Sequence, residues 1–235
     1  TGSAGDDPAK QINDIQDLIQ KKVDVLLINP TDSDAVVTAV KAANDAGIPV
    51  ITVDRQANGG EVATHIASDN VKGGQMAADF IKEKLGGKGN VVVLQGIPGS
   101  SAANERGKGF TEGIKGSGLK VVAEQPADFD RSKGLSVMEN IIQSTKDFKA
   151  VFAQNDEMAL GAISALKEAG LKDVVVVGFD GTDDGVAAVN NGEMAATIAQ
   201  QPEVIGQLAI DNVEKAKNGE KLDDFIPVPL KIVKK

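Results

Sequence analysis

The sequence predicts an α/β protein built from doubly wound parallel sheets. Short apolar runs rich in β-branched residues alternate along the chain with longer segments of helical periodicity. Several of the apolar runs end in a small polar or charged cluster, such as Asn29-Pro30 or Asp54-Arg55. Because the carboxyl ends of parallel strands share one edge of a sheet, these clusters are expected to line a common ligand site.

Helices are predicted wherever apolar residues recur with helical spacing. In residues 8–21, one apolar face carries Ile12, Ile15, Leu18 and Ile19. The other predicted helices cover residues 32–46, 70–85, 100–115, 131–144, 156–169 and 202–217. Glycines follow these segments at the expected C-terminal stops, namely Gly47, Gly86, Gly118, Gly170 and Gly219.

Strands are predicted between these helices. They include residues 25–28, 50–53, 151–153, 175–179 and 197–199. Pro49 opens one strand, which is a permitted position, whereas Pro227 and Pro229 restrict the final run to an edge or crossing segment. A strand followed by a helix, repeated many times, indicates parallel sheets with helices on both faces.

Composition limits the possible functions. The 235 residues suit one large domain or two small ones, and a net charge of −9 argues against binding to nucleic acid or anionic lipid. The absence of Cys excludes disulfides and Cys-based metal sites, and no apolar run approaches the ~20 residues of a membrane span. We expect neither a cofactor nor a metal, and the single His65 is interpreted as structural.

Enzyme motifs are not evident, and we expect a protein that is not an enzyme. The sequence has no G-x-S-x-G nucleophile elbow, no Cys nucleophile and no His-x-x-x-His zinc pair. Asp54 and Asp180 could imitate a glycosidase pair, but nearby arginines would keep both carboxylates ionised, whereas that chemistry needs one of them protonated.

Several long blocks of the sequence resemble bacterial D-ribose-binding proteins, the solute-binding components of sugar ABC transporters. Together these blocks extend the resemblance over residues 6–235, in the same order along the chain. They comprise residues 27–36, 53–56, 65–70, 102–107, 126–131, 152–161, 177–182 and 196–200.

The resemblance implies two flavodoxin-like lobes of the type I periplasmic-binding-protein kind, joined by three hinge crossings, with the sugar held in the cleft between them. The first lobe would hold residues 1–68 plus 201–229, and the second would hold residues 69–200 plus 230–235. The crossings would lie at Ser68, Asp69, Gln200, Gln201, Pro229 and Leu230.

The resemblance also implies a set of sugar-binding residues. Carboxylates accept hydrogen bonds from sugar hydroxyls, guanidinium groups donate them, and amides do both, while an aromatic ring stacks on the apolar face of the sugar. The matching residues are Asn29, Asp54, Arg55, Arg106, Phe129, Asn155, Asp180 and Gln200.

The implied partners are D-ribose or a related pentose, an ABC permease in the membrane and, as a further candidate, a chemoreceptor. The implied location is extracytoplasmic, in the periplasm or on the cell surface as a lipoprotein. Residues 1–5 lack the features of a signal peptide and resemble a linker. An alternative of another class, the effector core of a LacI-type repressor, needs a basic helix-turn-helix that this acidic sequence does not show.

The first lobe is expected to be truncated. The resemblance implies a first strand, a helix and a second strand that have no counterpart before residue 6, so the edge formed by residues 23–28 would be exposed. Either this segment is deleted, or it exists separately, or a second copy supplies it by strand exchange. An alternative function follows, in which the chain no longer binds sugar well and is a folding or dimeric assembly variant.

Overall fold

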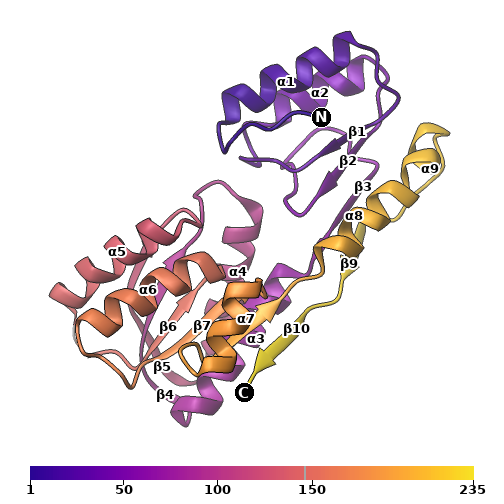
Figure 1. Cartoon of the computed structure of the whole chain (residues 1–235). Helices are drawn as coiled ribbons and strands as arrows, with labels where there is room; N and C mark the ends of the chain where they lie inside the picture. Colours follow the sequence, from indigo (N-terminus) through magenta and orange to yellow (C-terminus); the bar gives the residue numbers. More distant parts are fainter. Residues whose placement is uncertain (146) are drawn as a thin grey trace. The chain divides into compact units, whose positions relative to one another are not determined.

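The computed structural model describes residues 1–145 and 147–235, which form two compact units (Figure 1). Unit 1 consists of Thr1–Asp69, Gly99–Ala102 and Gln201–Pro229, and unit 2 consists of Asn70–Pro98, Ala103–Gln200 and Leu230–Lys235. This division differs from the expected lobes in two places. Asp69 and the segment Gly99–Ala102, both expected in the second lobe, belong to unit 1.

Hydrogen bonds explain why the short segment Gly99–Ala102 belongs to unit 1. The backbone N–H of Ser33 donates to the carbonyl oxygen of Gly99 at 3.0 Å. The N–H of Ser101 donates to the Ser33 hydroxyl at 3.2 Å, and the Ser101 hydroxyl accepts from the N–H of Gln56 at 2.9 Å. These contacts join residues far apart in sequence, so local patterns could not predict them.

Unit 1 contains a parallel sheet in the order β1-β2-β3-β9. Its strands are β1 (Leu26–Ile28), β2 (Val50–Val53), β3 (Thr64–Ser68) and β9 (Phe225–Val228). The last strand lies at an edge and contains Pro227, so the expectation of an edge position for this run is confirmed.

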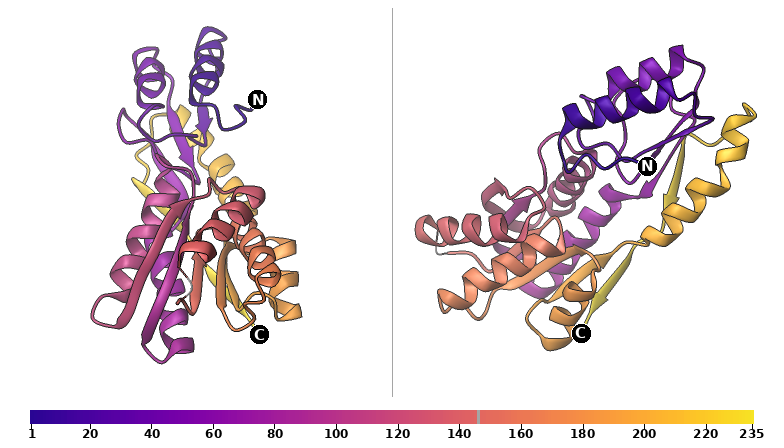
Figure 2. Two further views of the ribbon diagram at one scale, coloured as in Figure 1. Left: turned by 90° about the vertical axis from the view of Figure 1, so that its left-hand side faces the viewer. Right: turned by 45° about the horizontal axis from the view of Figure 1, so that its top comes forward.

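Helices cover both faces of this sheet (Figure 2). They are α1 (Pro8–Gln20), α2 (Val37–Asp45), α8 (Pro202–Asp211) and α9 (Val213–Lys217). Helices α1 and α2 form one core with β1 and β2, where Ile15, Val40 and Val50 are buried. Helices α8 and α9 pack on the other face, where Ile51 and Ile66 are fully buried.

Unit 2 contains a larger sheet in the order β10-β8-β7-β6-β4-β5, in which β10 is antiparallel to β8 and the other pairs are parallel. Its strands are β4 (Lys88–Gln95), β5 (Gly118–Pro126), β6 (Ala150–Ala153), β7 (Val175–Asp180), β8 (Ala196–Ala199) and β10 (Lys231–Lys234). The order reverses between β4 and β6, as in doubly wound folds.

The helices of unit 2 also cover both faces of their sheet (Figure 2). They are α3 (Asn70–Leu85), α4 (Ser101–Ile114, whose first two residues belong to unit 1), α5 (Arg131–Ser144), α6 (Asp156–Glu168) and α7 (Asp183–Asn191). One core joins α5, α6 and α7 to the sheet, and a second core joins α3 and α4 to the opposite face. In the part of the chain that the structure describes, no helix is both long and apolar enough to cross a membrane.

Two predictions about helix ends were inaccurate. Helix α2 begins at Val37 rather than at residue 32, because the Asp32 carboxylate accepts from the N–H groups of Asp34 and Ala35 and forms a turn instead. Gly118 does not end a helix but begins β5, and the left-handed residue after α4 is Gly116 with φ 76°.

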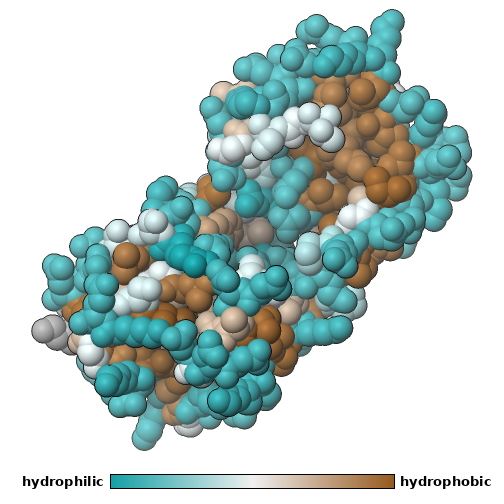
Figure 3. All heavy atoms as spheres, in the orientation of Figure 1, coloured by the Kyte–Doolittle hydropathy of each residue, from teal (hydrophilic) through white to brown (hydrophobic). Residues whose placement is uncertain are grey.

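Strand β1 is an edge strand, which confirms the expected exposed edge of unit 1. Among the described residues it pairs with β2 alone, and Leu27 is 40% exposed. Beside it lies a cavity of about 540 Å³ that the N-terminal segment, α1 and β1 line with Ile15, Leu18 and Leu26 among others. Figure 3 shows apolar atoms gathered on this unit. Dimerisation through this edge stays a prediction.

Candidate functional site

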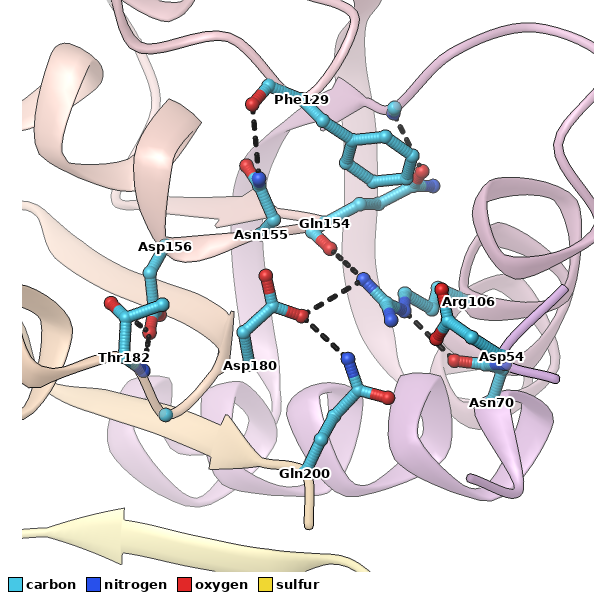
Figure 4. A network of polar contacts seen from close by, with 12 residues as sticks. Asp54, Asn70, Arg106, Phe129, Gln154, Asn155, Asp156, Asp180, Thr182 and Gln200 are labelled. Atoms are coloured by element: carbon cyan, nitrogen blue, oxygen red, sulfur yellow. Dashed lines mark hydrogen bonds and ion pairs between the residues drawn. The ribbon is translucent and has the colours of Figure 1, made fainter. Parts of the chain in front are cut away.

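Arg106 is the centre of a polar cluster in unit 2. It projects from α4 and is only 3% exposed. Its Nε donates to Asn70 Oδ1 at 2.9 Å, and its Nη1 donates to the carbonyl oxygen of Gln154 at 2.6 Å and lies 3.4 Å from Asp180 Oδ1 (Figure 4). Because an unpaired buried charge is very costly, these contacts both stabilise the guanidinium and fix its direction.

Asp180 lies at the carboxyl end of β7 and faces Gln200 as well as Arg106 (Figure 4). Gln200 Nε2 donates to Asp180 Oδ1 at 2.8 Å, and the backbone N–H of Gln200 donates to the Asp180 carbonyl at 2.9 Å. Parallel pairing of β7 with β8 brings these two strand ends together. The Asp180 side chain keeps 27% of its surface exposed, so its carboxylate has room to accept from a hydroxyl of a ligand.

Two aromatic rings border the Arg106 guanidinium. Its central carbon lies 3.8 Å from the centroid of the Phe179 ring and 5.8 Å from that of Phe129. Phe179 is fully buried, whereas Phe129 is half-buried and has a φ of 60°. The Phe129 ring packs on Gly96, where an added Cβ would lie 2.0 Å from a ring carbon. Only glycine at that position leaves space for the ring.

Asn155 caps a helix, in addition to the ligand contact expected from the sequence. It is the N-cap of α6, and its Oδ1 accepts from the N–H of Met158 at 2.9 Å. Its Nδ2 donates to the carbonyl oxygen of Phe129 at 3.1 Å (Figure 4). Asn155 therefore ties the start of α6 to the loop that carries the aromatic ring.

Unit 1 contributes a second, smaller polar group. Asn29 follows β1 and Asp54 follows β2, and parallel pairing of these strands brings them together. Asn29 Nδ2 donates to Asp54 Oδ2 at 3.2 Å, and Arg55 Nε lies 3.9 Å from the same oxygen. Asp54 has a left-handed φ of 62°. The adjacent residues Asp54 and Arg55 thus combine an acceptor and a donor at one strand end.

The structure therefore distributes the eight expected residues over two groups. Asn29, Asp54 and Arg55 belong to unit 1, and the others belong to unit 2. Each group lies at the carboxyl ends of parallel strands or in the segments that follow them, apart from Arg106 on α4. Both groups combine donors and acceptors as polyhydroxylated ligands require. Within residues 1–145 and 147–235, no group of His, Cys, Asp or Glu side chains is arranged to hold a metal ion.

Sequence reasoning missed several members of the cluster in unit 2. Phe179 was assigned only to a strand, yet its ring lies beneath the guanidinium of Arg106. Asn70 and the carbonyl group of Gln154 hold that guanidinium from two sides. The only local signal was the position of each residue next to the end of an apolar run.

Two doubly wound α/β units with polar groups at their strand ends define a ligand-binding protein of the periplasmic type. Residues 1–221 match the family model described as the periplasmic binding protein domain. The chain belongs to this family.

Two ribose import binding proteins share more than half of the aligned residues with this chain. The chain is 57% identical over 228 residues to the ribose import binding protein RbsB of Escherichia coli strain K12, an alignment that covers 97% of this chain and 77% of that protein. It is 53% identical over 229 residues to RbsB of Bacillus subtilis strain 168, with 97% and 74% covered.

Solved structures show the same fold. An ABC transporter solute-binding protein from Bacillus halodurans C-125 with bound myo-inositol has a TM-score of 0.93 and 33% identity, covering 98% of this chain and 81% of that one. A periplasmic solute-binding protein from Actinobacillus succinogenes 130z with bound D-allose has a TM-score of 0.91 and 31% identity, covering 99% and 84%. The predicted fold, the type I periplasmic binding protein fold, is confirmed.

Proposed function

We propose that this chain binds D-ribose as the solute-binding component of an ABC importer. The observation that carries the proposal is the cluster of Arg106, Asp180 and Gln200 beside two aromatic rings. A pentose presents several hydroxyls and one apolar ring face, and this cluster offers charged donors, charged acceptors and an aromatic surface. The high identity to ribose import binding proteins supports the choice of sugar.

We propose specific roles for the expected residues. Asp180 and Asp54 accept from sugar hydroxyls, Arg106 and Arg55 donate to sugar oxygens, and the Phe129 ring stacks on the sugar. The amides of Asn29, Asn155 and Gln200 complete the hydrogen bonds.

The two units would be the lobes of the receptor, and one sugar would contact both. The chain passes between the units after Asp69, Pro98, Ala102, Gln200 and Pro229, and the first, fourth and fifth of these passes support hinges at the positions expected from the sequence. Because a ligand shifts a conformational equilibrium only by its differential affinity, residues of both lobes must contribute.

The proposal includes a location and a partner. The protein would act outside the cytoplasm, in the periplasm or at the cell surface, and would deliver the sugar to a membrane permease; a chemoreceptor remains a further candidate partner. It would carry out no chemical reaction, and the carboxylates of Asp54 and Asp180, each beside an arginine, would serve as hydrogen-bond acceptors for the sugar.

Isothermal titration calorimetry of this chain with D-ribose tests the proposal. We expect saturable binding with a negative heat-capacity change, since the sugar face becomes buried. Binding of 2-deoxy-D-ribose should be weaker by about tenfold or more, because a missing hydroxyl leaves a buried partner unpaired. Equal affinity for both sugars would contradict the proposed network.

Two variants test the residues. Asp180→Ala and Arg106→Ala should each weaken D-ribose binding by about tenfold or more, the effect of one lost charged hydrogen bond. Arg131→Ala is a matched control in unit 2, because this exposed arginine pairs with Glu157 and Asp184. If the unaltered chain binds D-allose or myo-inositol but not D-ribose, the proposed sugar is wrong. Absence of binding to any sugar, with concentration-dependent dimers, would favour the assembly variant.

A further inference from the structure

Asp156 is a fully buried carboxylate that the proposed sugar contacts do not use. It is the first residue of α6 and has no exposed surface. Its Oδ2 accepts from the backbone N–H of Thr182 at 2.8 Å and from the Thr182 hydroxyl at 3.1 Å, and its Oδ1 accepts from the Thr197 hydroxyl at 2.7 Å. Figure 4 shows Asp156 and Thr182 on one side of Asp180.

The two threonine hydroxyls extend this network into the turn after β7. The Thr197 hydroxyl accepts from the N–H of Gly181 at 3.2 Å while it donates to Asp156. The Thr182 hydroxyl accepts from the N–H of Gly185 at 3.1 Å while it donates to the same carboxylate. Each hydroxyl has one proton and donates it to the Asp156 carboxylate. Each hydroxyl oxygen is therefore the acceptor for the backbone N–H that contacts it.

The turn that Asp156 holds has an uncommon backbone. Asp180 has a φ of 111° and Gly181 a φ of 72°. A non-glycine residue in such a conformation is strained, and it persists only where the surrounding contacts determine it. The N–H of Gln200 holds the Asp180 carbonyl on one side of this strained residue, and the N–H groups of Gly181 and Thr182 hold the other side through the Asp156 network.

Close packing around the carboxylate limits its movement. An added Cβ at Gly178 would lie 2.3 Å from Asp156 Oδ1, and one at Gly185 would lie 2.2 Å from Oδ2. Two glycines therefore allow the carboxylate to sit directly against the backbone of β7 and of α7. This arrangement fixes both oxygens in place.

Capping of α6 does not account for this carboxylate. The N-cap of α6 is Asn155, whose side chain accepts from Met158 N–H. Burial raises the pKa of Asp156, partly offset by the hydrogen bonds from Thr197 and Thr182. Burying the Asp156 carboxylate costs free energy, and the carboxylate is not needed to cap α6. Its position therefore indicates another role.

We infer that Asp156 is a positioning residue for sugar binding, which holds the turn after β7 so that the Asp180 carboxylate faces Arg106 and Gln200. This inference rests on the proposed function. Asp156 makes no contact with the sugar itself and acts through the backbone of Gly181 and Thr182.

A pair of substitutions at Thr197 tests the inference with little change in volume. Thr197→Val removes the hydroxyl that links Gly181 to Asp156 and should weaken D-ribose binding by about tenfold. Thr197→Ser keeps the hydroxyl and should bind within about twofold of the unaltered protein. Equal affinities for the two variants would overturn the inference. Ile141→Val, in the core of the same unit, is a control for loss of stability without contact to the network.

A double-mutant cycle separates positioning from general structural damage. Asp156→Asn should weaken D-ribose binding by about tenfold in the unaltered protein. In an Asp180→Ala background the same change should cost less than about twofold, because the carboxylate that it positions is already absent. Additive losses would overturn the inference.

A measurement without sugar separates this inference from the proposed function. If Asp156 positions the turn, Asp156→Asn should shift the amide NMR signals of Asp180, Gly181 and Gln200 in the sugar-free protein. Unchanged signals would overturn the positioning role, whatever ligand the protein binds. Failure of the unaltered chain to bind any sugar, with these signals shifted, would contradict the proposed function and leave the role of Asp156 in the turn supported.

Discussion

The guanidinium carbon of Arg106 lies 3.8 Å from the centroid of the Phe179 ring. This places a buried positive charge on the negative face of an aromatic ring, while Asp180, the residue next to Phe179, supplies the opposing carboxylate. Two consecutive residues of β7 therefore hold the same arginine from two directions. Together with the contacts to Asn70 and Gln154, they fix the plane of the guanidinium.

Phe179→Leu is expected to weaken D-ribose binding by about tenfold. A cation–π contact at a desolvated site contributes up to about 2 kcal/mol, and leucine would leave the guanidinium without the ring that orients it. The matched control is Phe152→Leu, in a fully buried ring of the same sheet that stacks on Phe110. Calorimetry measures the affinity for D-ribose, and thermal denaturation measures the stability. Phe152→Leu should lower the stability and leave the affinity unchanged. An equal loss of affinity in both variants would show that the effect is general.

Asp54→Asn is expected to weaken D-ribose binding by about tenfold without a measurable loss of stability. Asparagine tolerates the left-handed φ of 62°, and its amide oxygen can still accept from Asn29, so the change removes mainly the charge. Asp34→Asn is the control, because Asp34 accepts from Asn58 at 2.8 Å in the same unit. Unchanged affinity of the Asp54 variant would exclude this carboxylate from the sugar site.

Gly74→Ala is expected to destabilise unit 2. An added Cβ in α3 would lie 2.1 Å from the carbonyl oxygen of Arg106 and 2.7 Å from the amide nitrogen of Phe110, so α3 and α4 would have to separate. Overpacking of this kind costs about 1–3 kcal/mol. Gly206→Ala in α8 has nothing within 4 Å and should instead raise the free energy of unfolding by up to about 1 kcal/mol. Denaturant unfolding of both variants would reveal the opposite signs, and a shared sign would contradict the close helix approach.

The pH dependence of stability is expected to depend on His65. Burial lowers the pKa of this histidine below its usual 6.5, although contacts with Thr52 and Asp54 oppose the shift. As the pH falls below 6.5, His65 therefore becomes protonated in the unfolded chain before it does so in the folded protein. The free energy of unfolding should decrease between pH 6.5 and the lower pKa of His65 in the folded protein, and the contribution of His65 should be constant above pH 6.5.

Denaturant unfolding of the unaltered protein and of His65→Gln, compared between about pH 8 and about pH 5, measures this contribution. The difference in unfolding free energy between the two proteins should shrink or reverse toward low pH, because glutamine does not titrate. Parallel curves over the whole range would show that His65 has the same pKa in both states. The ring of His65 also stacks on Phe225 at 5.5 Å, so His65→Gln should lower the stability at high pH.

Much of the fold could be predicted because its signals are local. The alternation of apolar runs with helical segments predicted α/β units, and helices α3 and α5 begin and end where the sequence indicated. Strand β5 was not predicted, because it lies at a sheet edge with mostly exposed residues and has no continuous apolar run. The last predicted helix divides at Asn212, whose side chain donates to the carbonyl oxygen of Leu208 at 2.8 Å.

The sequence by itself determined the type of most elements and the presence of polar residues after several strands, since both depend on the pattern of a few neighbouring positions. Only the tertiary structure decided that Phe179 lies beneath Arg106 and that Asp156 holds the turn beside Asp180. It also decided that the segment Gly99–Ala102 belongs to unit 1. Such contacts join residues far apart in sequence. They depend on strand order and helix packing, which the local pattern of side chains does not encode.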